Sequence, residues 1–353
     1  MKTSMILAMS MLMLNTASAS SLETNTLATS SANGQGALLS PQAEPMQAQR
    51  SLPNDPMSQW SYQAQDITET EEVRVAALRS LGASPSQNGL VAVARGLKDD
   101  SPAIREAAIV GAEPYPLEYR WSLVSPLLTD DTQQVRITAA ASLLKDRSTL
   151  DAASQQQLSE PANELIGHLK DQADDASQLL LADVYRWTEQ YELAEVQYLQ
   201  SKQAAPNNPQ VRLSLADNYR AQGMDEKAID TLDQAIEALP SNAHFHFAKS
   251  LTLVRLEDKA AAVKESQIAA TMAKSNSYYW YVYGVLQEAF NIDEATTAFE
   301  TAYLISGAPE HLYAVCDIYV RYGNEKTDEC MVELAKIAPP SVIDQLNNKK
   351  AKI

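Results

Sequence analysis

Residues 175–240 decide the fold of this chain, and they read DASQLLLADVYRWTEQYELAEVQYLQSKQAAPNNPQVRLSLADNYRAQGMDEKAIDTLDQAIEALP. The stretch contains the same unit twice, and each landmark of the second copy follows its counterpart at one fixed interval. The shared landmarks are Leu181-Ala182, Tyr185, Ala194, Tyr198 and Pro206 in the first copy, and Leu215-Ala216, Tyr219, Ala228, Leu232 and Pro240 in the second. A fixed period of this length is typical of a solenoid, in which each unit covers the apolar face of its neighbour.

The spacing of these landmarks predicts two antiparallel helices in each unit. In the first copy, Leu181, Ala182 and Tyr185 share one face of a helix. Small side chains at Ala182 and Ala194 let the two helices approach closely, and Pro206 ends the second helix. The combined small, aromatic and proline positions resemble the tetratricopeptide repeat (TPR). This resemblance implies an all-α solenoid of helical hairpins.

Weaker copies of the unit continue to residue 340. They are marked, in order, by Leu253, Ala262 and Ala269, by Trp280, Gly284, Ala295, Phe299 and Ala302, and by Tyr319, Ala335 and Pro340. The turn between the two helices of the fourth copy is one residue shorter than in the others. We therefore predict five TPR units over residues 175–340.

A second, slightly shorter period lies upstream. It is carried by Val73-Arg74, Ile104-Arg105 and Val135-Arg136, which are evenly spaced and each followed by a pair of alanines. Asp99 and Asp130 precede the second and third arginines by six residues, whereas Thr68 stands at the equivalent place in the first unit. This pattern resembles the short HEAT-like repeats that also occur in bilin-lyase-type proteins, and it covers residues 66–147. The resemblance implies a ladder of Asp and Arg between neighbouring repeats, without implying lyase activity.

Composition predicts the remaining segments. Residues 1–19 have the charged start, short apolar core and small-x-small ending of a secretory signal peptide, so we expect cleavage near Ala19 and a periplasmic or secreted product. Residues 20–65 are poor in charged and large apolar side chains, which predicts a flexible low-complexity linker. Trp60 and Tyr62 leave open a docking segment there, or a cover for the first helix of the next domain. We expect residues 148–174 to be a helical connector and residues 341–353 to be a basic C-terminal tail.

The sequence contains no catalytic motif that we recognise. A Gly-rich phosphate loop, a Gly-x-Ser-x-Gly elbow and a His-Glu-x-x-His pair are all absent from it. His244 and His246 are two residues apart, so on one helix they point to different sides and do not share a metal. The net charge of -17 disfavours binding to nucleic acid or to an anionic membrane. We therefore expect no enzyme activity, no cofactor, no metal site and no membrane insertion.

Cys316 and Cys330 are the only cysteines of the chain. They fall on the two predicted helices of the last repeat, and an exported protein meets an oxidising compartment. A disulfide between them would close a loop of about 15 residues and contribute about 3 kcal/mol. The alternative is a pair of buried thiols, because Cys316 occupies the small-residue position of its helix. We expect the disulfide.

In the TPR family, the first helices of successive repeats line a groove that binds partner segments. The same register in this chain gives nine candidate partner-binding residues: Arg186, Trp187, Arg220, Phe247, Arg255, Tyr278, Tyr281, Tyr313 and Arg321. Guanidinium groups bind carboxylates bidentately, and aromatic side chains supply the apolar area of binding hot spots. We predict that the groove binds a segment of another exported protein that carries acidic residues. The alternative is that the aromatics pack between repeats and that the arginines pair with Asp183 and Asp217 on their own helices.

The order of the segments carries one further resemblance. A signal peptide, HEAT-like repeats and TPR units also make up the tail of some exported multihaem cytochromes, although the haem-attachment motif Cys-x-x-Cys-His is absent from this sequence. The leading prediction is an exported, non-catalytic scaffold for protein–protein interaction. The alternatives are an assembly or chaperone-like factor for an exported complex, for example a redox complex, and an enzyme.

Overall fold

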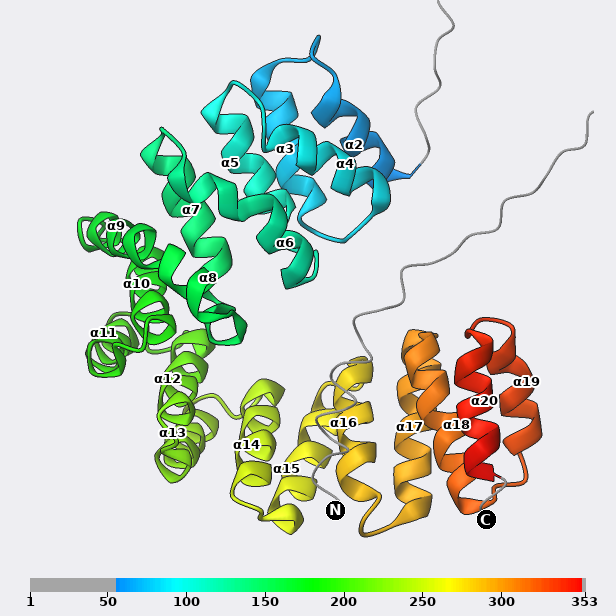
Figure 1. Ribbon diagram of the computed structural model, residues 1–353. Helices are drawn as coiled ribbons and strands as arrows, with labels where there is room; N and C mark the ends of the chain where they lie inside the picture. The colour runs from blue at the N-terminus through cyan, green and yellow to red at the C-terminus, as the bar shows by residue number, and fades with distance from the viewer. Residues whose placement is uncertain (1–54, 351–353) are drawn as a thin grey trace, which may run out of the picture. The chain divides into compact units, whose positions relative to one another are not determined.

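The computed structural model describes residues 55–350, and every regular element within them is a helix (Figure 1). The prediction of an all-α fold is therefore confirmed for this part of the chain. The predicted signal peptide and residues 20–54 of the predicted linker lie outside the described residues. The chain divides into two compact units, which meet in sequence between Leu127 and Leu128.

The first unit is made of short helices joined by tight turns. They are α2 (Pro56–Gln65), α3 (Glu71–Leu81), α4 (Gln87–Gly96), α5 (Pro102–Gly111) and α6 (Leu117–Val124). Helix α2 packs against α3 and α4, and α3 packs against α5. A 3-10 helix, Ser125–Thr129, spans the boundary between the two units.

Helix α2 corrects the predicted linker, which was expected to continue to residue 65. The side chain of Asp55 caps this helix by accepting hydrogen bonds from the backbone N–H groups of Met57 and Ser58, and Pro56 occupies the first turn. Ser61 and Ala64 are small enough to be buried. The polar composition of this segment therefore has a structural explanation. Asp55 caps the helix, and the small residues Ser61 and Ala64 form its buried face. Helical packing therefore begins one helix earlier than the sequence period indicates.

The guanidinium of Arg74, on α3, links neighbouring helices of the first unit. Its Nη2 atom lies 2.6 Å from Oδ2 of Asp99, which precedes α5 in the next repeat. Its Nε atom donates to the carbonyl oxygen of Ala64 on α2 at 3.3 Å. The pKa of the Asp99 carboxyl is lowered, because the backbone of Ser101 and the guanidinium of Arg74 outweigh the effect of burial. Arg74 therefore links α3 both to α2 and to the turn between α4 and α5.

The second unit begins with a segment that joins the two sequence periods. Its helices are α7 (Gln133–Leu144), a 3-10 helix (Arg147–Thr149), α8 (Ala152–Gln157) and α9 (Ser159–Lys170). Helix α9 packs on α7 and also on the next helix in the chain. Arg136 on α7 donates from Nε to Glu164 of α9 at 2.8 Å. Residues 133–170 therefore belong to the same compact unit as the helices that follow. The boundary between the two units lies between Leu127 and Leu128, before residue 147, where the upstream sequence period was predicted to end.

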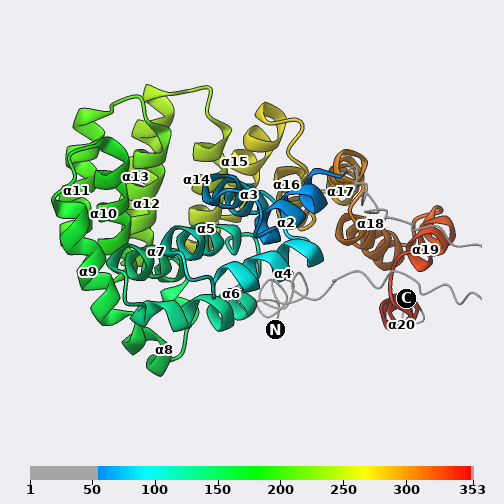
Figure 2. The ribbon, with the colours of Figure 1, turned by 90° about the horizontal axis from the view of Figure 1, so that it is seen from above.

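Five helix pairs follow one another over residues 175–335 (Figures 1 and 2). The first helices of the pairs are α10 (Asp175–Trp187), α12 (Pro209–Ala221), α14 (Ala243–Arg255), α16 (Ser277–Gln287) and α18 (Pro309–Tyr322). The second helices are α11 (Tyr191–Ala204), α13 (Asp225–Ala238), α15 (Lys259–Met272), α17 (Ile292–Ser306) and α19 (Thr327–Ala335). Within each pair the two helices pack against each other, and each second helix packs on the first helix of the next pair.

The core of these pairs is built from the repeated landmarks of the sequence. Ala182, Ala194, Ala216 and Ala228 are all 0 % exposed, as required where two helix backbones approach closely, and so is Tyr198. The backbone conformation of the turn between the two helices also repeats from pair to pair. In the first three pairs the turn between the helices holds a left-handed residue at the same position, namely Glu189 (φ 64), Gly223 (φ 73) and Glu257 (φ 61).

The last helix, α20 (Pro340–Lys350), corrects the predicted C-terminal tail. Leu346 is 0 % exposed, and Val342 and Ile343 pack against the same core as α18 and α19. These three side chains form an apolar helix face that can bury itself on the end of the array. Terminal repeats of a solenoid need such a cover, because no further repeat protects their apolar side.

Cys316 and Cys330 form a disulfide, with their Cα atoms 5.5 Å apart. The bond joins α18 to α19 within the terminal pair. Cys316 is 0 % exposed and Cys330 is 8 % exposed, so the bond is part of the core. Among residues 55–350, no helix is long and apolar enough to cross a membrane.

Candidate functional site

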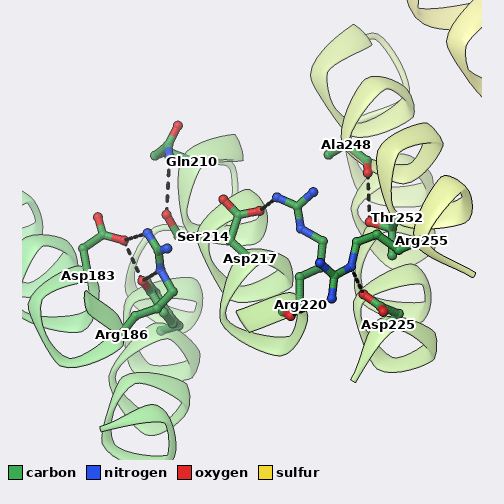
Figure 3. A network of polar contacts seen from close by, with 11 residues as sticks. Asp183, Arg186, Gln210, Ser214, Asp217, Arg220, Asp225, Ala248, Thr252 and Arg255 are labelled. Atoms are coloured by element: carbon green, nitrogen blue, oxygen red, sulfur yellow. Dashed lines mark hydrogen bonds and ion pairs between the residues drawn. The ribbon is translucent and has the colours of Figure 1, made fainter. Parts of the chain in front are cut away.

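Acidic and arginine side chains alternate across α10, α12, α13 and α14 (Figure 3). On α10, Nη2 of Arg186 lies 3.1 Å from Oδ1 of Asp183. Tyr198, on α11, donates its hydroxyl to the same Asp183 oxygen at 2.6 Å and accepts from Nε of Arg186 at 3.1 Å. These three side chains form a closed triangle that fixes the guanidinium between the two helices.

The next two repeats continue this pattern. On α12, Arg220 pairs with Asp217, three residues before it. On α14, Arg255 donates from Nε to Asp225 of α13 at 2.8 Å, and its Nη2 atom approaches the carbonyl oxygen of Arg220 at 3.4 Å. We call these six residues, Asp183, Arg186, Asp217, Arg220, Asp225 and Arg255, the acid–arginine ladder.

The ladder is electrically balanced and partly buried. Burial alone would lower the pKa of Arg186, but contact with Tyr198 and the charges of Asp183 and Asp217 raise it. Asp217 belongs to the next repeat, so the charges of neighbouring repeats act on one another. The exposed fraction of the arginine side chain is 20 % at Arg186, 24 % at Arg220 and 52 % at Arg255. The ladder is therefore open to solvent along one side.

The structure thus places Arg186 and Arg220 in the ion pairs with Asp183 and Asp217 that formed the alternative interpretation, whereas Arg255 pairs with an acid of the preceding repeat. This arrangement does not use up their donors. A guanidinium has five N–H groups, and Arg220 donates to a carboxylate through Nη2 only. Asp217 holds this guanidinium in place, while its remaining donors can still bind a second acceptor.

Arg321, the fourth predicted arginine, lies in a separate charge cluster at the end of the array. It pairs with Glu288, the residue that follows α16, through both guanidinium ends, and its Nε atom lies 2.7 Å from Oδ2 of Asp317. Asp317 is only 2 % exposed, and Lys349 from α20 reaches its other oxygen at 2.5 Å. Because α20 covers this part of α18, the Asp317 side chain is not available to a partner.

Four of the predicted aromatic residues form a row over α14, α16 and α18. The ring centroids of Phe247 and Tyr278 are 5.7 Å apart, and those of Tyr278 and Tyr281 are 6.5 Å apart. Tyr313 follows on α18, with Nζ of Lys349 at 5.9 Å from its ring centroid. We call Phe247, Tyr278, Tyr281 and Tyr313 the aromatic row. Trp187 lies apart from it, with the guanidinium carbon of Arg186 at 5.9 Å from its ring centroid.

The row contains both packing residues and one exposed residue. Phe247 stacks on Tyr279, with ring centroids 4.3 Å apart. Tyr281 packs against Phe299 and His311, and burial raises the pKa of its hydroxyl. Tyr278 differs because it is 51 % exposed. It is the member of the row best placed to meet another molecule.

Several residues of the site were missed by sequence reasoning. Tyr198 was recognised only as a packing residue, although its hydroxyl joins the ladder. Asp225 was missed because it lies at the start of a second helix, outside the first-helix register. Lys349 was missed because its segment was predicted to be a tail. Asp183 and Asp217, which lie one repeat apart, were the available signal that each arginine comes with its own acid.

The charge cluster around Glu288 gives a testable pH dependence. Burial raises the pKa of this carboxyl, but hydrogen bonds and charge from Arg321 outweigh burial and lower it below its ordinary value near 4.5. The unfolded chain therefore binds a proton before the folded chain does as the pH falls. The stability that this pair contributes is present above the unfolded pKa and is lost as the pH falls through the folded pKa.

We expect Glu288→Gln to cost about 1 kcal/mol of unfolding free energy at neutral pH, and progressively less as the solution is acidified below the unfolded pKa. Urea unfolding of both proteins over a pH series measures this difference. Arg321, Asp317, Tyr322 and Lys349 remain in place in the variant as the surrounding charged and polar groups. A difference that stays constant down to the acid limit would contradict the assigned ionisation.

Among residues 55–350, no group of three or more His, Cys, Asp or Glu side chains is arranged to hold a metal ion. The described acidic residues of the ladder and of the Glu288 cluster face arginines or lysines instead.

No model of a known protein family matches this chain, and no curated protein matches it. Solved structures do resemble it over about half of its length. A crystal structure of MamA is 22 % identical with a TM-score of 0.38, covering 49 % of this chain and 98 % of that chain. YrrB, described as a TPR protein with an unusual peptide-binding site, is 18 % identical with a TM-score of 0.40, covering 53 % of this chain and 97 % of that chain.

A third structure, TTC0263, is described as a thermophilic TPR protein in Thermus thermophilus. It is 14 % identical with a TM-score of 0.36, and the alignment covers 50 % of this chain and 98 % of that chain. Since these scores are below 0.5, the assignment of the fold rests on the helix pairs of the chain itself. Those pairs make it an all-α repeat solenoid.

Proposed function

We propose that this protein is a non-catalytic scaffold that binds a segment of another protein along the first helices of its TPR pairs. The observation that carries the proposal is the acid–arginine ladder. Each arginine of the ladder is held in place by an ion pair with an aspartate and still has further N–H groups that can donate to another molecule. Groups that are already fixed lose little conformational freedom on binding, so such a surface favours association.

The chemistry of the ladder indicates what the partner brings. A carboxylate or a row of backbone carbonyls can accept from the remaining donors of Arg220 and Arg255, which lie on neighbouring repeats. The acids of the ladder neutralise its charge, so the contact is selective for well-placed acceptors more than for net negative charge. We therefore propose a partner segment that presents acidic side chains at intervals matching the repeats.

The aromatic row extends the proposed surface towards α16. Exposed tyrosines are common anchors of protein interfaces, because they bury a large apolar area and keep a hydroxyl for hydrogen bonding. Tyr278 is exposed, and it is held in position by an edge-to-face contact with Phe247 and by stacking on Tyr281. We propose that Tyr278 contacts an apolar side chain of the same partner segment.

We also propose that the scaffold acts outside the cytoplasm. Two features support export: the signal-like sequence of residues 1–19, and a disulfide, which persists in oxidising compartments. The partner is then another exported protein. Recovering the native chain only from the cytoplasmic fraction, with residues 1–19 retained, would contradict this part of the proposal.

Affinity capture of partners on the tagged protein, followed by titration calorimetry, tests the binding surface. We expect Arg220→Gln to weaken the complex about tenfold to a hundredfold, because a hydrogen bond to a charged group is worth about 1.5–3 kcal/mol. Glutamine is preferable to a charge reversal here, since a glutamate would face Asp217 and disturb the fold.

Arg147→Gln is the matched control. Its side chain is 21 % exposed, close to the 24 % of Arg220, and it also pairs with one acid, Glu189, at 2.6 Å. Arg147 lies outside the ladder, so the control should bind like the unmodified protein. Equal affinity of the two variants for the captured partner would rule the ladder out as the binding surface.

A further inference from the structure

A second surface, separate from the ladder, lies between the last two repeats. It is a cleft of about 490 Å³. One wall is formed by residues of α17, namely Thr297, Glu300, Thr301, Tyr303 and Leu304. The floor is formed by Leu312, Val315 and Tyr319 of α18. The other wall is formed by Glu329, Cys330 and Glu333 of α19 and by Lys326, which precedes that helix. The ladder lies on other repeats, so a molecule in this cleft does not touch it.

The cleft exists because α19 is shorter than the other second helices. Helix α19 ends at Ala335, shortly before Pro339 and Pro340, whereas α17 continues for 15 residues to Ser306. The last turn of α17 therefore has no turn of α19 beside it. Leu304, in that turn, is 85 % exposed.

The sequence at this position sets the last repeats apart from the others. The residues equivalent to Leu304 in the three preceding repeats are Thr271, Glu237 and Gln203, all of them polar. A leucine thus stands where the preceding repeats have an exposed polar side chain, at the repeat junction where the following second helix, α19, is short. An exposed apolar side chain beside an apolar floor marks a contact site for another molecule.

The rim of the cleft is negatively charged. Three glutamates, Glu300, Glu329 and Glu333, surround it together with a single lysine, Lys326. Lys326 is 4.0 Å from Glu300, which also accepts from the hydroxyl of Tyr319. Glu333 pairs with Lys336 in a contact whose two side chains are about 60 % exposed, so this pair is weak. An apolar floor with an acidic rim complements a segment that is both apolar and basic.

We propose that this cleft binds an amphipathic helical segment of a partner protein, with aliphatic side chains against Leu304, Leu312 and Val315 and with lysines or arginines at the glutamate rim. The ligand differs in charge from the acidic segment proposed for the ladder. The protein then holds two segments at once, one on α10–α16 and one between α17 and α19. This inference does not depend on the ladder binding anything.

The test uses a defined probe, the fluorescein-labelled amphipathic peptide KLAKLAKKLAKLAK, whose binding is followed by fluorescence anisotropy. We expect Leu304→Gln to raise the Kd about tenfold or more, since glutamine restores the polar character found in other repeats and removes the apolar contact. Because Leu304 is largely exposed, the variant should keep the helicity and the urea midpoint of the unmodified protein.

Two controls separate this cleft from general attraction to an acidic protein. Leu193→Gln changes another exposed leucine, 50 % accessible on α11, and should leave the Kd unchanged. The peptide ELAELAEELAELAE keeps the aliphatic face and reverses the charge, and it should not bind measurably. Arg220→Gln should bind the lysine peptide normally, so a failure of the ladder proposal is distinguishable from a failure of this one.

Three outcomes would overturn the inference. The first is equal binding of the lysine peptide to Leu304→Gln and to the unmodified protein. The second is equal binding of the two peptides to the unmodified protein. The third is a concentration-dependent dimer, seen by analytical ultracentrifugation, that dissociates in Leu304→Gln, because the occupant would then be a second copy of this chain.

Discussion

Replacing Phe299 with alanine is expected to lower the unfolding free energy of the second unit by about 3–5 kcal/mol, the range for a buried aromatic residue. Phe299 is 4 % exposed and belongs to the core that joins the last two repeats. Its ring lies 5.7 Å from that of Tyr281 in the aromatic row. The cavity would therefore weaken the packing beneath the proposed partner surface as well as the core. Urea unfolding followed by circular dichroism measures the loss.

The contact between Phe299 and Gly284 provides an internal check. A Cβ atom added at Gly284 would lie 3.0 Å from ring carbons of Phe299, so Gly284→Ala should overpack the junction and cost about 1–3 kcal/mol. Combining Gly284→Ala with Phe299→Leu should cost less than the sum of the two single changes, because the smaller side chain leaves room for the methyl group. Strict additivity would mean that the two residues do not meet as described.

Loss of the Cys316–Cys330 disulfide is expected to cost about 3 kcal/mol, from the loop-closure entropy returned to the unfolded chain. In a solenoid each repeat interacts only with its neighbours, so the loss should be concentrated in α18, α19 and α20. Hydrogen exchange should show faster opening of these helices after reduction, with α10–α13 unchanged.

The double variant Cys316→Ala, Cys330→Ala is the control for effects of the reductant itself. It should resemble the reduced protein, and adding reductant to it should change nothing. Thiol titration of the denatured, unreduced protein provides an independent reading. Two reactive thiols in protein isolated without reductant would show that the bond does not form.

Much of the second unit could be predicted from the sequence because its packing is repetitive. Ala182 and Ala194 recur one repeat later as Ala216 and Ala228, and each sits at a point where two helices touch. Both ends of the repeat arrays were predicted wrongly. Residues 56–65 and 340–350 are polar or basic on average, but Ala64 and Leu346 supply a narrow buried face that composition does not reveal.

The candidate site was predictable only in part. The helical register found Arg220 and Tyr278, and it offered Asp217 as the acid that Arg220 meets, but it did not indicate the partner of Arg255. Arg255 pairs with Asp225 of the preceding repeat, 30 residues away, and this choice depends on how the helices are stacked. The cleft beside Leu304 could not be predicted either, since it depends on the early end of α19.

Site-specific photo-crosslinking tests the central claim most directly, namely that a partner segment lies along the first helices of the five helix pairs. A photoreactive phenylalanine analogue placed at Tyr278, on α16, should crosslink to the captured partner. The same analogue at Leu193, on a second helix and of nearly equal exposure, should not. Crosslinking from position 193 and none from position 278 would contradict the account and move the partner to the opposite helices of the array.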